Sequence, residues 1–147
     1  MEVIDLMTPN PACCTQDTNL QAVAQMMKEN DCGMIPVVDS MDNMNPIGTV
    51  SDRDITIRCV AEGKNPLDAT AGDIMSQPVV TVHSHDTVVD TARKMEENMV
   101  RRIPVVDENN SVVGIVAQAD LALQARKNQA YEVVQEVSKP TTSSSTV

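Results

Sequence analysis

The sequence predicts an α+β fold made of two β-α-β-β-α units that pack sheet to sheet with pseudo-twofold symmetry. Three observations lead to this prediction: an internal repeat, an alternation of helical and β-branched stretches, and an aliphatic composition. The chain has 147 residues, 41% of them apolar, but no Trp, no Phe and a single Tyr. Its core must therefore consist of Val, Ile, Leu, Ala and Met, and its length suits one compact domain or two very small ones.

The internal repeat becomes visible when the sequence is compared with itself at a shift of 68 residues. Residues 35–39, Ile-Pro-Val-Val-Asp, return as residues 103–107. Flanking matches keep the same order and pair Asp5 with Asp73, Met7 with Met75, Ala24 with Ala92 and Met27 with Met95. After a gap of two residues, Gly48, Val50 and Asp54 pair with Gly114, Val116 and Asp120. One shared pentamer can arise by chance, but this ordered set indicates a tandem duplication.

Both copies predict the same order: a short strand, capping residues, an amphipathic helix, two strands joined by a polar turn, and a second helix. In the first copy the strands are 12–15, 34–38 and 47–50, and Asp17 and Thr18 are the capping residues. The first helix has an apolar face of Leu20, Val23, Ala24 and Met27, and the second runs from near Asp52 to Gly63. In the second copy the strands are 79–82, 103–106 and 112–116, and Asp86 and Thr87 are the capping residues. The first helix has an apolar face of Val88, Ala92, Met95 and Met99, and the second begins near Ala119. A helical stretch over 68–75 links the copies.

These elements divide the chain into repeat 1 (residues 2–66), repeat 2 (67–125), a C-terminal helical extension (126–138) and a disordered tail (139–147) rich in Ser and Thr. A long helix is expected over 121–137, with an apolar stripe of Ala130, Val133, Val134 and Val137 that packs on another surface. One unit of about 60 residues buries too little surface to be stable alone. We therefore expect the two copies to share one aliphatic core.

Charge and composition exclude several classes of partner. The net charge is −10, and such a surface repels both nucleic acid backbones and anionic lipid headgroups. The N-terminus lacks the features of a signal peptide, and no apolar stretch is long enough to cross a membrane. The four cysteines (Cys13, Cys14, Cys32 and Cys59) form no Cys-x-x-Cys pair, which favours reduced thiols in the cytoplasm.

No catalytic arrangement is visible in the sequence, and a metal site is not expected. Cys13 and Cys14 lie near the start of repeat 1, and His83 and His85 lie at almost the equivalent place in repeat 2. Cys and His are ligands that zinc accepts, but neighbouring residues on a strand point to opposite faces. At most one of the two thiols can therefore face a given site. Small buried thiols are favoured over zinc binding and over a disulfide with Cys32.

The ordered motifs resemble the cystathionine-β-synthase (CBS) domain, and the two copies resemble its tandem pair, the Bateman module. The resemblance covers about residues 2–125 and rests on Asp-Ile-Met at 73–75, Pro-Val-Val-Thr-Val at 78–82, Arg-Arg-Ile-Pro-Val-Val-Asp at 101–107 and the closing Gly-x-Val-x-x-x-Asp. It implies a regulatory module, not an enzyme, that binds an adenine nucleotide in clefts between the repeats. AMP, ADP and ATP are the expected ligands, ahead of S-adenosylmethionine and NAD. A homodimer is expected, and an unknown protein target is left open.

The resemblance also assigns residues to two clefts. Residues 48–54 match the family motif Gly-x-x-Thr/Ser-x-x-Asp, in which Asp54 holds the ribose and Ser51 reaches the phosphate or the sugar. Because the family builds each cleft from both repeats, the rest of the first cleft is expected to come from Met75, Val80, Val100 and Arg101.

The second cleft is expected to be weak or empty. It combines Asp120 with Met7, Ala12, Cys32 and Gly33, but Ala117 stands where the motif has a hydroxyl, and no Arg occupies the matching place. A plainer interpretation of both motifs stays open, because an acidic residue at a helix start is favourable by about 0.3–1 kcal/mol without any ligand. The chain is then a protein-interaction or dimerisation module with vestigial clefts.

Overall fold

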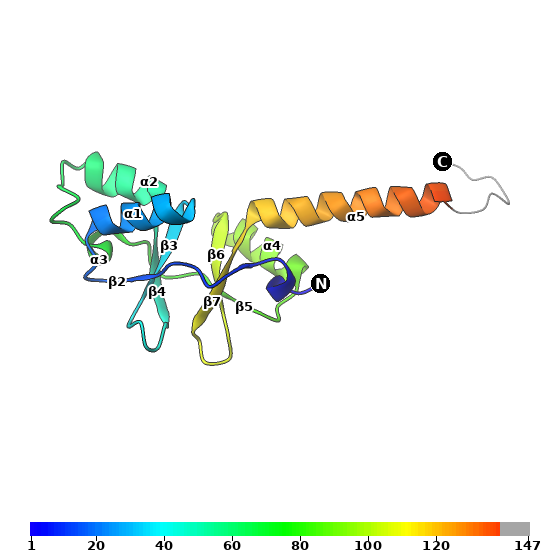
Figure 1. Cartoon of the computed structure of the whole chain (residues 1–147), viewed down its shortest axis with the longest axis horizontal. Coiled ribbons are helices and arrows are strands. Elements are labelled where there is room, and N and C mark those ends of the chain that lie inside the picture. The colour runs from blue at the N-terminus through cyan, green and yellow to red at the C-terminus, as the bar shows by residue number, and fades with distance from the viewer. Residues whose placement is uncertain (139–147) are drawn as a thin grey trace.

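Two sheets with their helices form the two halves of the molecule. The computed structural model describes residues 1–138, with side chains described up to residue 128. One sheet has the strand order β2-β3-β4, and the other has the order β1-β7-β6-β5. The two halves lie side by side, and a long C-terminal helix extends away from the second half (Figure 1). This architecture confirms the predicted α+β fold of two repeats.

The two halves contain the same elements in the same order. The first half contains β2 (Cys14–Thr15), α1 (Leu20–Asn30), β3 (Met34–Val38), β4 (Pro46–Ser51) and α2 (Asp52–Ile55), which continues as a π-helix (Thr56–Val60). The second half contains β5 (Val82–His83), α4 (Val88–Asn98), β6 (Arg102–Val106), β7 (Val112–Ala117) and α5 (Gln118–Ser138). Flanking segments hold a 3-10 turn (Val3–Asp5), β1 (Thr8–Pro9) and α3 (Ala71–Ile74). None of the described helices is both long and apolar enough to cross a membrane.

Several local predictions differ from the structure. The outer strands β2 and β5 are shorter than predicted, and the link between the copies is helical only over the four residues of α3. The cap of α1 is Asn19, whose side chain accepts the Ala22 N–H at 2.8 Å, and not Asp17 or Thr18. Thr87 caps α4 as predicted.

The buried faces of α1 and α4 are narrower than predicted. Ala24 and Ala92 are exposed, so fewer positions on each helix contact the sheet. Met99 is 92% exposed and ends α4 in the left-handed conformation, with φ 53°. The predicted helix over 121–137 is part of α5. Its apolar stripe (130–137) and the tail 139–147 lie outside the residues whose side chains or placement the structure describes.

The N-terminal segment of repeat 1 packs on the second half. The Val3 and Ile4 amides donate to the carbonyls of Asp86 and Ser84 at 2.9 Å each, and β1 pairs antiparallel with β7. Val3 is fully buried in the core of the second half, together with Val82, Met95, Ile103, Val105, Val116 and Leu121. The second half is therefore completed by residues that begin the first repeat.

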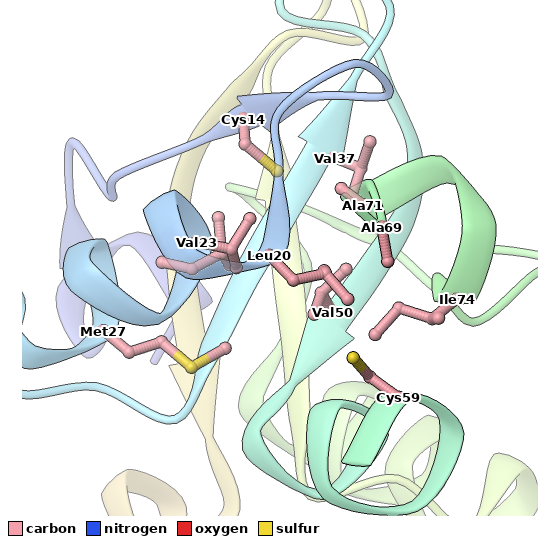
Figure 2. Close-up of a cluster of buried hydrophobic side chains, with 11 residues drawn as sticks. Cys14, Leu20, Val23, Met27, Val37, Val50, Cys59, Ala69, Ala71 and Ile74 are labelled. Carbon is pink, nitrogen blue, oxygen red and sulfur yellow. The ribbon is translucent and has the colours of Figure 1, made fainter. Parts of the chain in front are cut away.

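The segment between the repeats packs on the first half in return. Ala69, Ala71 and Ile74 lie in the core of the first half, beside α1 and β4 (Figure 2). Ser76 and Thr49 exchange backbone hydrogen bonds of 2.8 and 3.2 Å. Each repeat thus gives its leading segment to the other half.

A smaller cluster joins the two halves and consists of Cys13, Val38, Met44, Val106 and Val112. Beside it, the turn between β3 and β4 contacts the turn between β6 and β7. The Val112 N–H donates to the Met44 carbonyl at 2.9 Å, and the Asn45 side-chain amide donates to the Asn110 carbonyl at 2.8 Å. The prediction of one shared core is too simple, because the exchanged segments let each half close a core of its own.

The glycines of the repeated motif leave room for the exchanged segments. A Cβ on Gly48 would stand 2.7 Å from the Met75 sulfur and 3.1 Å from the Ser76 carbonyl oxygen. A Cβ on Gly114 would meet the Met7 sulfur and stand 3.1 Å from the Thr8 carbonyl oxygen. The Met sulfur atoms can move, but the carbonyl oxygens belong to close-packed backbone that yields little, so a Cβ at either position is crowded and glycine is favoured.

The neighbouring cysteines enter different clusters, as expected for adjacent residues on an extended chain. Cys13 lies in the cluster that joins the halves, and Cys14 lies in the core of the first half. Burial raises the pKa of the Cys13 thiol to about 11 and that of Cys14 to about 12, where the nearby Cys13 adds to the effect. Cys59 is also buried, whereas Cys32 is half-buried.

Replacing Gly114 by Ala will destabilise the fold by about 1–3 kcal/mol, because the added methyl group overpacks the contact between β1 and β7. Since the chain has no Trp, unfolding in urea should be followed by far-UV circular dichroism. Gly63→Asn is the control, because no atom lies within 4 Å of an added Cβ at Gly63 and Asn tolerates its φ of 73°. Equal stability of Gly114→Ala and the parent would contradict this account of the motif glycine.

The native protein will have one fast-reacting thiol, Cys32. At pH 8 about 0.1% or less of Cys13 and Cys14 is thiolate, which is the reactive form, because burial raises their pKa values. Reaction with Ellman's reagent should show one fast phase that the Cys32→Ser variant lacks. A fast phase of two or more thiols in the folded protein is the opposite result.

Candidate functional site

Two clefts lie between the halves, at the ends of the strands away from the contacting turns. The first measures about 510 Å³, and its walls include Thr49, Ser51, Ser76, Val100, Arg101 and Arg102. The second measures about 450 Å³, and its walls include Thr8, Ala12, Cys32, Gly33, Ala117 and Asp120. The duplication relates them, because Ser51 corresponds to Ala117, Ser76 to Thr8, and Arg101 to Gly33.

Three of the six residues expected in the first cleft line its wall, namely Ser51, Val100 and Arg101. Met75 packs against Gly48 and the core of the first half. Val80 packs against the core of the second half. These two aliphatic residues therefore support the region around the cleft but do not form its described wall.

Asp54, the acidic residue of the motif, is fixed by a capping box at the start of α2. The Ser51 N–H donates to its carboxylate at 2.9 Å, and the Asp54 N–H donates to the Ser51 hydroxyl at 3.0 Å. The Ser76 hydroxyl donates to the same carboxylate at 3.2 Å, and the Arg58 Nε lies 3.8 Å away. The Asp54 side chain is only 13% exposed, so a sugar hydroxyl that reaches it must share it with these donors.

The same capping box recurs at the start of α3, where neither Thr70 nor Asp73 lines either cleft. There the Thr70 N–H donates to the Asp73 carboxylate at 2.9 Å. This backbone hydrogen bond, helped by the Thr70 hydroxyl, lowers the pKa of the Asp73 carboxyl below its usual value. A capping box alone therefore does not mark a ligand site in this protein.

The first cleft is positively charged in an acidic protein. Arg53, Arg101 and Arg102 line it, and Asp52 is the acidic residue on its wall. None of the ion pairs among the described residues involves these three arginines. The whole chain has 11 basic and 21 acidic residues, so this concentration of free guanidinium groups selects for anions.

The second cleft contains four of the five residues expected on its wall: Ala12, Cys32, Gly33 and Asp120. The Asp120 carboxylate accepts the Ala117 N–H at 2.9 Å, as Asp54 accepts from Ser51. Met7 packs against Gly114 and the core of the second half, as its counterpart Met75 does on the first.

Two residues that sequence reasoning missed change the chemistry of the second cleft. Arg102 lines this cleft as well as the first one, and Thr8 supplies a hydroxyl from β1. The second cleft thus has both a cation and a hydroxyl, although neither stands at the place that the repeat predicts. In the sequence Arg102 stands next to Arg101, which places it beside the first cleft, and nothing there indicates that its side chain also lines the second.

The Cys and His side chains that could bind zinc are not gathered in one place among the described residues. Within that part of the chain, no three His, Cys, Asp or Glu side chains come together as a metal centre requires. Cys13 and Cys14 belong to separate apolar clusters, and the His85 ring pairs with the Glu2 carboxylate at 3.0 Å. These candidate ligands are therefore not arranged around one ion.

Comparisons with known proteins agree with the duplicated fold. The family model of the CBS domain matches the chain twice, over residues 3–60 and 71–125. The chain is 33% identical over 136 residues to hypoxic response protein 1 of Mycobacterium tuberculosis, which covers 92% of this chain and 93% of that protein. It is 39% identical over 99 residues to the uncharacterized protein MK0525 of Methanopyrus kandleri, which covers 67% of this chain and 50% of that protein. The chain thus spans half of one relative and nearly all of the other.

Solved structures share the architecture. A crystal structure of hypoxic response protein 1 with two coordinated zinc ions has a TM-score of 0.74 at 35% identity, over 83% of this chain and 97% of that chain. The CBS domain pair of protein MJ0100, in complex with 5′-methylthioadenosine and S-adenosyl-L-methionine, has a TM-score of 0.77 at 25% identity, over 87% and 98%. The protein CBSX2 in complex with AMP has a TM-score of 0.71 at 26% identity, over 87% and 98%. With two matches to the family model, two equivalent halves and a cleft for each repeat, the chain belongs to the CBS domain family.

Proposed function

We propose that this CBS pair is a regulatory module that binds an adenine nucleotide in the first cleft and transmits its occupancy to a partner protein. The observation that carries the proposal is the set of three arginines on the wall of that cleft, none of which forms an ion pair with a described residue, in a chain of net charge −10. The hydroxyl groups of Thr49 and Ser51 lie on the same wall and can donate to a sugar or a phosphate, whereas the Ser76 hydroxyl donates to Asp54 and can accept from a sugar hydroxyl.

Structural relatives support an adenine ligand. The CBS pair of MJ0100 holds 5′-methylthioadenosine and S-adenosyl-L-methionine, and CBSX2 holds AMP. These ligands share an adenosine moiety but differ in charge. The charge of the cleft then decides among them, because three guanidinium groups attract phosphates and repel the cationic sulfonium of S-adenosylmethionine. We therefore place AMP, ADP and ATP ahead of S-adenosylmethionine.

The base must be recognised without aromatic stacking. The single Tyr is residue 131, and the chain has no Trp or Phe. Val100 and Met34 supply apolar contacts in the first cleft, so specificity for adenine rests on the shape of this aliphatic slot and on backbone hydrogen bonds.

The alternative function is a protein-interaction or dimerisation module with vestigial clefts. Exposed apolar side chains favour it, since Val89 is 67% exposed on α4 and Leu123 is 47% exposed on α5. The two proposals are compatible where a second copy covers the helices and the clefts stay open. Free cysteines are consistent with the reducing cytoplasm as the place of action.

Asp54→Asn will weaken AMP binding by about 10-fold or more, because a charged acceptor that holds the ribose is replaced by a neutral one. Asp73→Asn is the matched control: it alters the same capping geometry at α3, away from the clefts, and should leave binding unchanged. Isothermal titration calorimetry of the parent and both variants with AMP, ADP, ATP and S-adenosylmethionine measures the effect.

Two results of this titration would contradict the proposal. Absence of heat with every adenine compound removes the sensor function and favours the interaction module. An equal loss of affinity in Asp54→Asn and Asp73→Asn shows that stability, and not ribose contact, links Asp54 to binding. Partner proteins captured equally well with and without nucleotide would support the vestigial-cleft alternative.

A further inference from the structure

The two clefts share part of their walls. Met34 and Arg102 line both of them. These residues begin β3 and β6 and occupy equivalent positions in the two repeats. At the boundary between the clefts, repeat 1 therefore contributes the thioether of Met34, and repeat 2 contributes the guanidinium of Arg102 at the equivalent position.

The guanidinium of Arg102 reaches toward the second cleft across Gly33. The Arg102 Nη1 atom lies 2.8 Å from the place where a Cβ on Gly33 would stand, and the Asp52 Oδ2 atom lies 2.9 Å from it. Gly33 belongs to the second cleft, and Asp52 belongs to the first. The absence of a side chain at Gly33 thus makes room for Arg102 between the two sites.

The other cations are not shared. Arg53 and Arg101 line the first cleft only, and the described wall of the second cleft has no cationic side chain except Arg102. None of the ion pairs among the described residues occupies the Arg102 guanidinium. The Asp52 carboxylate lies near the guanidinium but forms no ion pair with it, so Arg102 is available to a ligand on either side.

We propose that Arg102 is a phosphate-binding residue shared by the two clefts, so that an anionic adenine ligand in one cleft weakens the binding of a second one in the other. This inference rests on the proposed nucleotide-binding function. A phosphate in the first cleft engages the donors of Arg102 and fixes its direction. A second phosphate then meets a neutralised cation and a nearby like charge. A neutral nucleoside makes no such demand, so its binding to the two clefts is independent.

Methyl NMR can follow each cleft separately. Met99 lines the first cleft and not the second, and Ile115 lines the second and not the first. In protein labelled with ¹³C at Met and Ile methyl groups, titration with AMP or with adenosine gives a midpoint for each cleft.

Arg102→Met makes the shared wall symmetric and should raise the AMP midpoint at both Met99 and Ile115, with the adenosine midpoints unchanged. Arg101→Met is the matched variant, because Arg101 lines only the first cleft. It should raise the AMP midpoint at Met99. It should also lower the AMP midpoint at Ile115, because Arg102 becomes free for the second cleft. We expect this decrease to be about 5-fold or more, which is the lower end of typical coupling between two sites. Arg102→Lys keeps the charge without the planar fork and should give AMP midpoints between those of the parent and of Arg102→Met.

The outcomes separate this inference from the proposed function. If Arg102→Met moves the AMP midpoint at one reporter only, or Arg101→Met leaves that at Ile115 unchanged, sharing is wrong and nucleotide binding stands. If neither AMP nor adenosine shifts either methyl signal, the proposed function fails and the inference fails with it. Ligand-free spectra check that each variant is folded. If Arg102→Met does not fold, the AMP midpoints of Arg102→Lys at both reporters test the sharing of Arg102 instead.

Discussion

The exchange of leading segments between the repeats is the constraint on which the rest of the structure depends. A β-α-β-β-α unit of about 60 residues encloses too little apolar surface to stand alone. Here Val3 closes one core, and Ala71 and Ile74 close the other, so neither half is complete without residues from the opposite repeat. The same segments then continue into the clefts, where β1 contributes Thr8 and the chain after α3 contributes Ser76. The same two segments therefore complete both the cores and the clefts.

Much of the fold could be predicted because its main elements have local sequence patterns and because these patterns occur in both repeats. The continuous apolar run of β3 and the helical periodicity of α1 and α4 are clear in the sequence, and each pattern occurs twice. The exchange could not be predicted from the residues alone, since β1 has two residues and α3 has four, too few to show any period. The exposure of Ala24 has a similar cause, because a small side chain satisfies a helical pattern without being needed in the core.

The residues of the candidate site also differ in whether the sequence alone could identify them. Ser51 could be predicted from its motif and Arg101 from its position in the repeat, because both signals depend on sequence order alone. The role of Arg102 in the second cleft was missed because it depends on the direction of a long side chain that passes over Gly33, and that direction has no sequence signature. The Asp54 carboxylate lies between the two cases: the motif identified it, but only the structure shows that a capping box holds it beside the wall.

The contacts between the hairpin turns have a mechanical consequence. The bonds from Asn45 and Val112 tie the halves together at one end of the strands, and the clefts lie at the other end. The six residues of β4 form a rigid arm about 20 Å long between the two. A rotation of about 3° about the turns therefore moves the cleft wall by about 1 Å, so a change of about 1 Å in the width of a cleft corresponds to a small rotation of one half against the other.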